Sequence, residues 1–166
     1  MNFFIKLKEI KNNFFKKNNI YYLILITIIF SLDRISKSKI ISNFNDRNYF
    51  INDYLNFELF WNTGIGFGLL SSTSNTFYNV ITIIIAIIIS FLLSMGLNSK
   101  TSEKIFFSFI IGGALGNFYD RIIFKAVPDF IDLHYKSFHW FTFNIADIFI
   151  TIGIVLILFS GLREKN

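Results

Sequence analysis

Apolar residues gather in four long blocks along this chain, separated by polar stretches. The clearest block contains "VITIIIAIIISFLLSMGL" and runs from about 77 to 97. About 20 apolar residues let a helix cross the hydrocarbon core of a bilayer. The first block reaches that length only if its helix continues past Leu32, with Lys37 and Lys39 turned outward to the interface. The pattern therefore predicts four transmembrane helices, at about 20–37, 77–97, 105–120 and 143–162.

The polar stretches 38–76 and 120–142 would then face the same side of the membrane. In the first, aromatic and polar residues alternate through "RNYFINDYLNFELFWNTG", which favours an extended or strand-like segment on the membrane surface. The predicted fold class is an all-α membrane protein. It has four transmembrane helices, a small extracytoplasmic strand-like aromatic segment between helices one and two, and a single domain over 1–166.

Composition supports a membrane protein. Hydrophobic residues make up 53% of the chain and charged residues 16%, against roughly 25% charged residues in soluble proteins. The net charge of +5 does not form a basic stripe, which disfavours nucleic-acid binding. Basic residues instead concentrate in segment 1–19, before the first block, which indicates a cytoplasmic N-terminus. Four spans would place both termini in the cytoplasm.

A basic start followed by a short apolar block also fits a cleavable signal peptide. No small-x-small cleavage pattern follows Leu32, so we favour a retained membrane anchor. The chain contains no cysteine, which excludes disulfides, thiol nucleophiles and cysteine-ligated metals.

Polar residues cluster at the predicted outer ends of the spans. If the helices bundle, these side chains converge near the outer interface, as groups of an active site do. They are Asp33, Asn62, Gly64, Asn117, Asp120, Arg121, Asn144 and Asp147, with Asp129 and Asp132 in the predicted outer loop "VPDFID". The glycines of "GGALG" (112–116) would allow a neighbouring helix to approach closely. Asp120 and Arg121 are expected to neutralise each other as a local ion pair.

Asp129 and Asp147 differ from the other acids because neither has a basic residue within one helical turn along the chain. Two carboxylates brought together near lipid cannot both ionise easily, so one retains a proton. Such a pair supplies the base and acid of aspartyl proteolysis. Spacing alone leaves two alternatives open, an ion-conducting pair and a purely structural pair.

Other chemistries find less support. His134 is expected to be a solvated loop residue, and His139 an interfacial residue beside Trp140. No metalloprotease motif is present, and we expect no metal or cofactor. The stretch "GIGFG" (64–68) lacks the neighbours of a phosphate-binding loop and is interpreted as a flexible turn.

Five blocks, in this order and spacing, resemble lipoprotein signal peptidase (signal peptidase II), a bacterial membrane aspartyl peptidase family. The blocks are "DRISK" (33–37), "NTGIGFG" (62–68), "GGALGNFYDR" (112–121), "VPDFID" (127–132) and "FNIAD" (143–147). The resemblance implies an endopeptidase that removes signal peptides from prolipoproteins, cleaving before a diacylglyceryl-modified cysteine at the outer membrane face. Asp129 and Asp147 match the family's catalytic pair.

The resemblance also implies supporting roles. Residues that match positions holding the substrate backbone or the acid pair are Asn62, Gly64, Asn117, Arg121 and Asn144. Asp33 and Asp120 match supporting acidic positions, for which a structural role is the better interpretation. Asp132 often accompanies the motif without being catalytic. Segment 44–61 would form a cradle or lid over the peptide.

The implied partners are a diacylglyceryl-prolipoprotein and membrane phospholipid, with the enzyme a monomer in the bacterial cytoplasmic (inner) membrane. The chain departs from the family pattern at Gly66, Pro128 and Phe141, where Ala, Val and Pro are usual. Proline restricts its own φ and favours an extended Val127, so we expect a stiffened loop before Asp129.

Two rival classes fit less well. A presenilin-type protease needs a G-x-G-D block, which this chain lacks. A proton-coupled carrier usually has more spans, an inverted repeat and a carboxylate near the midplane, whereas Asp147 lies near a span end.

Overall fold

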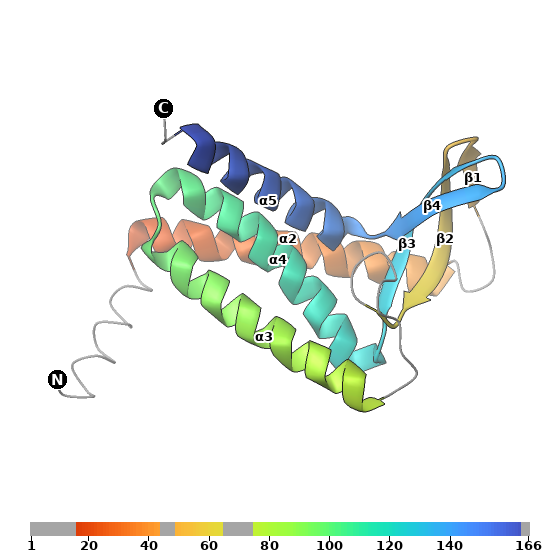
Figure 1. Cartoon of the computed structure of the whole chain (residues 1–166), viewed down its shortest axis with the longest axis horizontal. Helices are drawn as coiled ribbons and strands as arrows, with labels where there is room; N and C mark the ends of the chain where they lie inside the picture. Colours follow the sequence, from red (N-terminus) through yellow and green to blue (C-terminus); the bar gives the residue numbers. More distant parts are fainter. Residues whose placement is uncertain (1–15, 44–48, 65–74, 164–166) are drawn as a thin grey trace.

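The structure is a computed structural model that describes residues 16–43, 49–64 and 75–163. Helices lie in all four predicted apolar blocks, and strands occupy the two segments between them (Figure 1). In chain order the elements are α2 (Lys17–Asn43), β1 (Tyr49–Asn52), β2 (Leu55–Asn62), α3 (Asn75–Asn98), α4 (Thr101–Phe124), β3 (Val127–Tyr135), β4 (Phe138–Phe143) and α5 (Ile145–Arg163).

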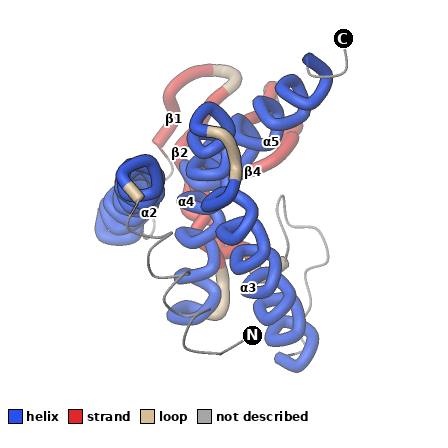
Figure 2. Tube along the Cα trace, turned by 90° about the vertical axis from the view of Figure 1, so that its left-hand side faces the viewer, coloured by secondary structure: helices blue, strands red, loops and turns tan. Residues whose placement is uncertain are grey.

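Helix α4 is the centre of the bundle and packs against α2, α3 and α5 (Figure 2). Its glycines make this close packing possible, as the sequence predicted. A Cβ added at Gly112 would lie 2.7 Å from Ile29 Cβ in α2, and one at Gly113 would lie 2.5 Å from the Ala146 carbonyl oxygen in α5. The backbones of three helices therefore approach one another near the middle of α4.

The strands form one antiparallel sheet in the order β1-β2-β3-β4, at one end of the bundle (Figure 1). The extended segment predicted between the first two helices is confirmed for residues 49–62, whereas 44–48 lie outside the described residues. The expectation of an all-α fold with a loop at 120–142 is wrong, because β3 and β4 form a second hairpin there. Its two-residue turn is Lys136–Ser137, and Lys136 has a φ of 55°. Two-residue hairpin turns usually contain Gly or Asn. This turn contains neither, so the residues gave no sign of a hairpin here.

The predicted loop around Pro128 is likewise a strand. Pro128 is the second residue of β3 and pairs with Trp61 of β2. Its ring contributes to a buried stretch that continues into Asp129 and Phe130. The extended geometry expected of Val127 is confirmed, although it belongs to a sheet. Gly66 lies outside the described residues.

Two of the helices, α2 and the 78–98 part of α3, are long and apolar enough to cross a membrane, and 145–161 of α5 is a shorter apolar helix. Large apolar side chains on α3 and α5 point away from the protein, with Ile87 63% exposed and Phe159 65% exposed. Such surfaces are typical of contact with a membrane or a partner. The count of four spans stays a prediction.

Candidate active site

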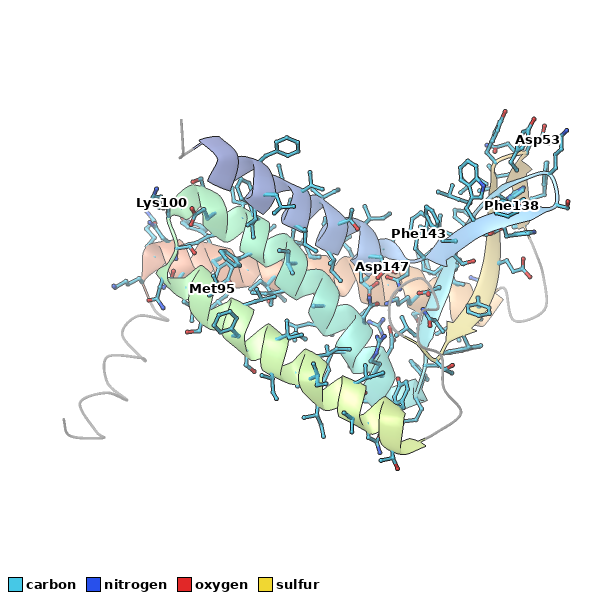
Figure 3. The ribbon with its side chains drawn as sticks, in the orientation of Figure 1. Asp53, Met95, Lys100, Phe138, Phe143 and Asp147 are labelled. Atoms are coloured by element: carbon cyan, nitrogen blue, oxygen red, sulfur yellow. The ribbon has the colours of Figure 1, made fainter. Side chains whose placement is uncertain are left out.

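Asp129 and Asp147 meet where the sheet joins the helices. Asp129 is the third residue of β3, and Asp147 lies in the first turn of α5, at this junction in Figure 3. Both contact Asn144, which lies between β4 and α5. The Asn144 side-chain amide donates to Asp129 Oδ1 at 2.6 Å, and its backbone N–H donates to Asp147 Oδ2 at 3.1 Å. One residue therefore holds both carboxylates.

Asp129 is 2% exposed. The Asn62 amide donates to its second oxygen, Oδ2, at 2.9 Å. Burial, and then the charge of Asp147, raise the pKa of Asp129 to about 7, although the hydrogen bonds from Asn62 and Asn144 favour the ionised form. This carboxyl group can therefore gain or lose a proton near neutral pH.

Asp147 is placed by a reciprocal cap at the start of α5. Asn144 Oδ1 accepts a hydrogen bond from the Asp147 backbone N–H at 3.2 Å, and the Asp147 carboxylate accepts from the Asn144 N–H. This is a capping box, with Asn and Asp in place of the usual residues. A negative side chain is also favoured at a helix N-terminus. The cap explains why the apolar α5 begins with a carboxylate, and Asn117 of α4 donates to its other oxygen at 2.8 Å.

A cavity of about 570 Å³ lies beside the two carboxylates. Its polar end is formed by Asn62, Asn117, Arg121, Asp129 and Asp147. Isoleucines and other apolar side chains of α3, α4 and α5 line the remainder, among them Ile85, Ile88, Leu92, Ile150 and Ile154. The cavity therefore joins an acid pair to a long apolar wall.

A buried charge cluster supports this site from α2. Lys37 Nζ lies 3.0 Å from Asp33 and 2.8 Å from Asp120, and it donates to Asn117 Oδ1 at 2.8 Å. Arg34 also pairs with both aspartates. Asp33 Oδ1 in turn accepts from the Ala146 N–H at the start of α5. The cluster thus fixes both Asn117 and the helix end that carries Asp147.

Two sequence expectations are wrong here. Lys37 does not turn outward: it is fully buried, with 0% exposure. Asp120 does not pair with Arg121, because neighbouring residues of a helix point in different directions. Its partners are Arg34 and Lys37 of α2, which sequence reasoning did not place in the site. The only local signal is the i,i+4 spacing of Asp33 and Lys37 within "DRISK".

Arg121 fixes the segment after β2. Its guanidinium donates to the Gly64 carbonyl at 2.8 Å and to the Asn117 carbonyl at 3.3 Å. The Gly64 N–H donates to Asn62 Oδ1 at 2.8 Å, which closes a short turn beside the acid pair. Residues 65–68 of the "NTGIGFG" block lie outside the described residues.

The structure brings together the predicted Asp33, Asn62, Gly64, Asn117, Asp120, Arg121, Asp129, Asn144 and Asp147. Asp132 is separate from them and contacts the two histidines. His134 is 5% exposed in β3, so the expectation of a solvated loop residue is wrong. His139 is 54% exposed, in keeping with an interfacial position.

Comparison with known proteins agrees with this arrangement. The family model described as signal peptidase (SPase) II matches residues 25–163. The lipoprotein signal peptidase of Pelagibacter ubique (strain HTCC1062) is 45% identical over 153 residues, covering 90% of this chain and 92% of that protein. That of Anaplasma phagocytophilum (strain HZ) is 39% identical over 154 residues, covering 90% and 97%. A solved structure described as a bacterial membrane enzyme superposes with a TM-score of 0.70 at 30% identity, covering 88% of this chain and 90% of that chain. The chain therefore belongs to the signal peptidase II family.

Proposed function

We propose that this chain removes signal peptides from prolipoproteins by aspartyl proteolysis, with Asp129 and Asp147 as the catalytic pair. Family membership supports the activity and the class of substrate. One observation supports the chemistry: two carboxylates contact the same asparagine and line the same cavity. The raised pKa of Asp129, about 7, fits a pair that shares one proton at neutral pH.

In this mechanism one carboxylate is ionised and the other protonated. The ionised carboxylate takes a proton from a water molecule as the water oxygen attacks the scissile carbonyl carbon. The protonated partner gives its proton to the carbonyl oxygen, which forms a neutral tetrahedral diol. The C–N bond then breaks. The amine nitrogen takes the proton held by the first carboxylate, and the diol returns its hydroxyl proton to the second. Both aspartates regain their starting states.

The surrounding residues suit this reaction. The amides of Asn62, Asn117 and Asn144 orient the carboxylates through the hydrogen bonds described above. Arg121 holds the Gly64 turn at the polar end of the cavity, where the substrate backbone would lie. The apolar wall formed by α3, α4 and α5 suits a signal-peptide segment and an attached diacylglyceryl group.

The proposal includes the location and orientation of the enzyme. The enzyme would act as a monomer in the bacterial cytoplasmic (inner) membrane, with four spans, both termini in the cytoplasm and phospholipid around the helices. The acid pair would face the extracytoplasmic side. Exposed aromatic side chains on the sheet support an interfacial position, with Phe50 65% exposed, Tyr54 60% and Trp140 58%. The β1–β2 hairpin would serve as the cradle or lid over the peptide.

The test uses purified Asp129→Asn and Asp147→Asn variants with a diacylglyceryl-prolipoprotein substrate in mixed micelles. Each should lose at least about 100-fold in kcat, because each removes one partner of the acid–base pair. Glu103→Gln is the matched control, because Glu103 lies in the first turn of α4, at the end of the bundle away from the sheet (Figure 1), and this variant should cleave the substrate normally. Unchanged helicity must accompany the loss. Full activity in either well-folded variant refutes the assignment.

A further inference from the structure

The two histidines of the chain meet one buried carboxylate on the β3–β4 hairpin. Asp132 and His134 are two residues apart on β3, and His139 of β4 is the cross-strand partner of His134. Asp132 Oδ2 lies 2.8 Å from His139 Nδ1 and 3.3 Å from His134 Nδ1. Potential ligand atoms of the three residues all lie within 4.8 Å of one another.

This cluster is distinct from the acid pair. Phe138, the neighbour of His139, lies near the tip of the sheet, far from Asp147 (Figure 3). Successive residues of a strand point to opposite faces, so Asp129 and Asp132, three residues apart, project from opposite faces of β3. The function proposed above therefore leaves these three side chains without a role.

Two buried atoms of the cluster make no hydrogen bond among the described residues, although His134 Nδ1 lies 3.3 Å from Asp132 Oδ2. Asp132 is 2% exposed and His134 5% exposed. Within the part of the chain that the structure describes, Asp132 Oδ1 and His134 Nδ1 make no hydrogen bond. Buried polar atoms are normally satisfied, and each exception calls for an explanation such as an ion. A neutral imidazole nitrogen and a carboxylate oxygen are both electron-pair donors, so one cation could satisfy both.

We propose that Asp132, His134 and His139 bind one divalent transition-metal ion of the Zn²⁺ type. Zinc takes imidazole nitrogen and carboxylate oxygen at about 2.0–2.2 Å, so neighbouring ligand atoms of a tetrahedral site lie about 3.4 Å apart. The distances of 2.8 and 3.3 Å between Asp132 Oδ2 and the two Nδ1 atoms are close to that value, and the ligand atoms as a group, which lie within 4.8 Å of one another, would draw together around the ion. His139 is 54% exposed and can move, and water would complete the coordination.

The arrangement of the two imidazole rings also suits a single ion. The imidazole rings of His134 and His139 stack with centroids 5.4 Å apart and an interplanar angle of 27°. One ion beside Asp132 could therefore contact a nitrogen of each ring. Lys136 does not fill this place, because its Nζ lies over the Tyr135 ring, 5.4 Å from the centroid.

A bound ion would join β3 to β4 near their turn. The same hairpin carries Asp129 at its start and leads directly into Asn144 and α5. The ion would thus stabilise a hairpin whose ends carry the acid pair, without contacting the substrate. The proposal does not depend on aspartyl catalysis.

The experiment measures Zn²⁺ binding by the full chain, purified in detergent without a polyhistidine tag and stripped of metal by a chelator. Titration against a chromophoric chelator should show one saturable equivalent per chain. His139→Gln and Asp132→Asn should each weaken binding more than about tenfold, since even residues that only orient a ligand contribute 10–100-fold. Glu58→Gln is the matched control, because it removes a carboxylate from β2 outside the cluster, and it should bind Zn²⁺ normally.

A second readout guards against misfolding. Zn²⁺ should raise the Tm of the wild-type protein and of Glu58→Gln, and this rise should be absent in His139→Gln. Because His139 also contacts the buried Asp132, the rise in each variant is measured from that variant's own metal-free Tm. The proposal is overturned if the wild type shows no saturable Zn²⁺ binding, or if His139→Gln binds Zn²⁺ as tightly as the wild type.

Discussion

Replacing Lys37 by methionine isolates the electrostatic role of the buried cluster. Lys37 is 0% exposed and joins Asp33, Asp120 and Asn117. Two cations and two carboxylates make the cluster neutral, because Arg34 is the second cation. Methionine keeps the unbranched shape of the side chain up to the position of Cε and removes the positive charge. The variant therefore buries a net negative charge between α2 and α4.

The magnitude follows from the distances. Nζ lies 3.0 Å from Asp33 Oδ2 and 2.8 Å from Asp120 Oδ2. With an effective dielectric constant of about 20, each attraction is worth about 6 kcal/mol. Dehydrating the lysine ammonium opposes this by several kcal/mol. We therefore expect Lys37→Met to lower the free energy of unfolding by about 3–5 kcal/mol, the range found when one partner of a buried pair is removed.

The assay is reversible unfolding in mixed micelles, followed by the loss of helical signal. Lys39→Met is the matched control, because Lys39 is exposed on the same helix, and it should change stability by less than about 0.5 kcal/mol. Adding Asp33→Asn to Lys37→Met restores neutrality and should recover part of the loss, because an asparagine Oδ1 can still accept from the Ala146 N–H. The reasoning is refuted if Lys37→Met is as stable as the wild type. It is also refuted if the double variant loses more unfolding free energy than the two single variants lose in sum.

Two further predictions concern the acid pair and the helix contacts. Cleavage should decline as pH rises through about 7, where Asp129 loses its proton. The unfolding free energy should fall as pH rises from about 4 to 7, because over this range the folded chain holds a proton that the unfolded chain has lost. Asn62→Ala removes a hydrogen bond that favours the ionised form, so the alkaline limb of the kcat/KM profile should move to higher pH; a downward move would contradict the assignment. Gly113→Val should lower the unfolding free energy by about 1–3 kcal/mol, because its Cβ meets the Ala146 carbonyl, whereas Gly161→Ala, with open space around it, should be neutral in the same unfolding assay.

The helices could be predicted because the information is local. An apolar block of sufficient length must hide its backbone polar groups, and a helix does so within one segment. The predicted ends were less accurate: α2 continues to Asn43, beyond the expected end near 37, and α4 continues to Phe124. Helices often extend past their apolar part, and hydropathy alone does not record where the last hydrogen bond forms.

The candidate site could be predicted in outline for a related reason. Polar residues in an otherwise apolar chain must find partners, so their collection at one end of the bundle followed from sequence order. The capping pattern Asn144-x-x-Asp147 is also local. The hydrogen bonds alone revealed that these two residues both cap α5 and position the acid pair. The involvement of Lys37 could not be seen, because a lysine near a span end usually reaches for water.

By itself, the sequence predicted the apolar helices and the glycine contacts of α4, and the motifs shared with a known family supplied the proposed pairing of Asp129 with Asp147. These depend on composition, spacing and motif within single segments. The tertiary structure alone decided that β3 and β4 form a hairpin, that Asp120 pairs with α2, and that Asp132 meets both histidines. Each of these contacts joins segments whose mutual orientation is set by packing. The whole fold selects strand pairs and buried ion pairs among many alternatives. The local conformational preferences of single residues therefore do not predict them.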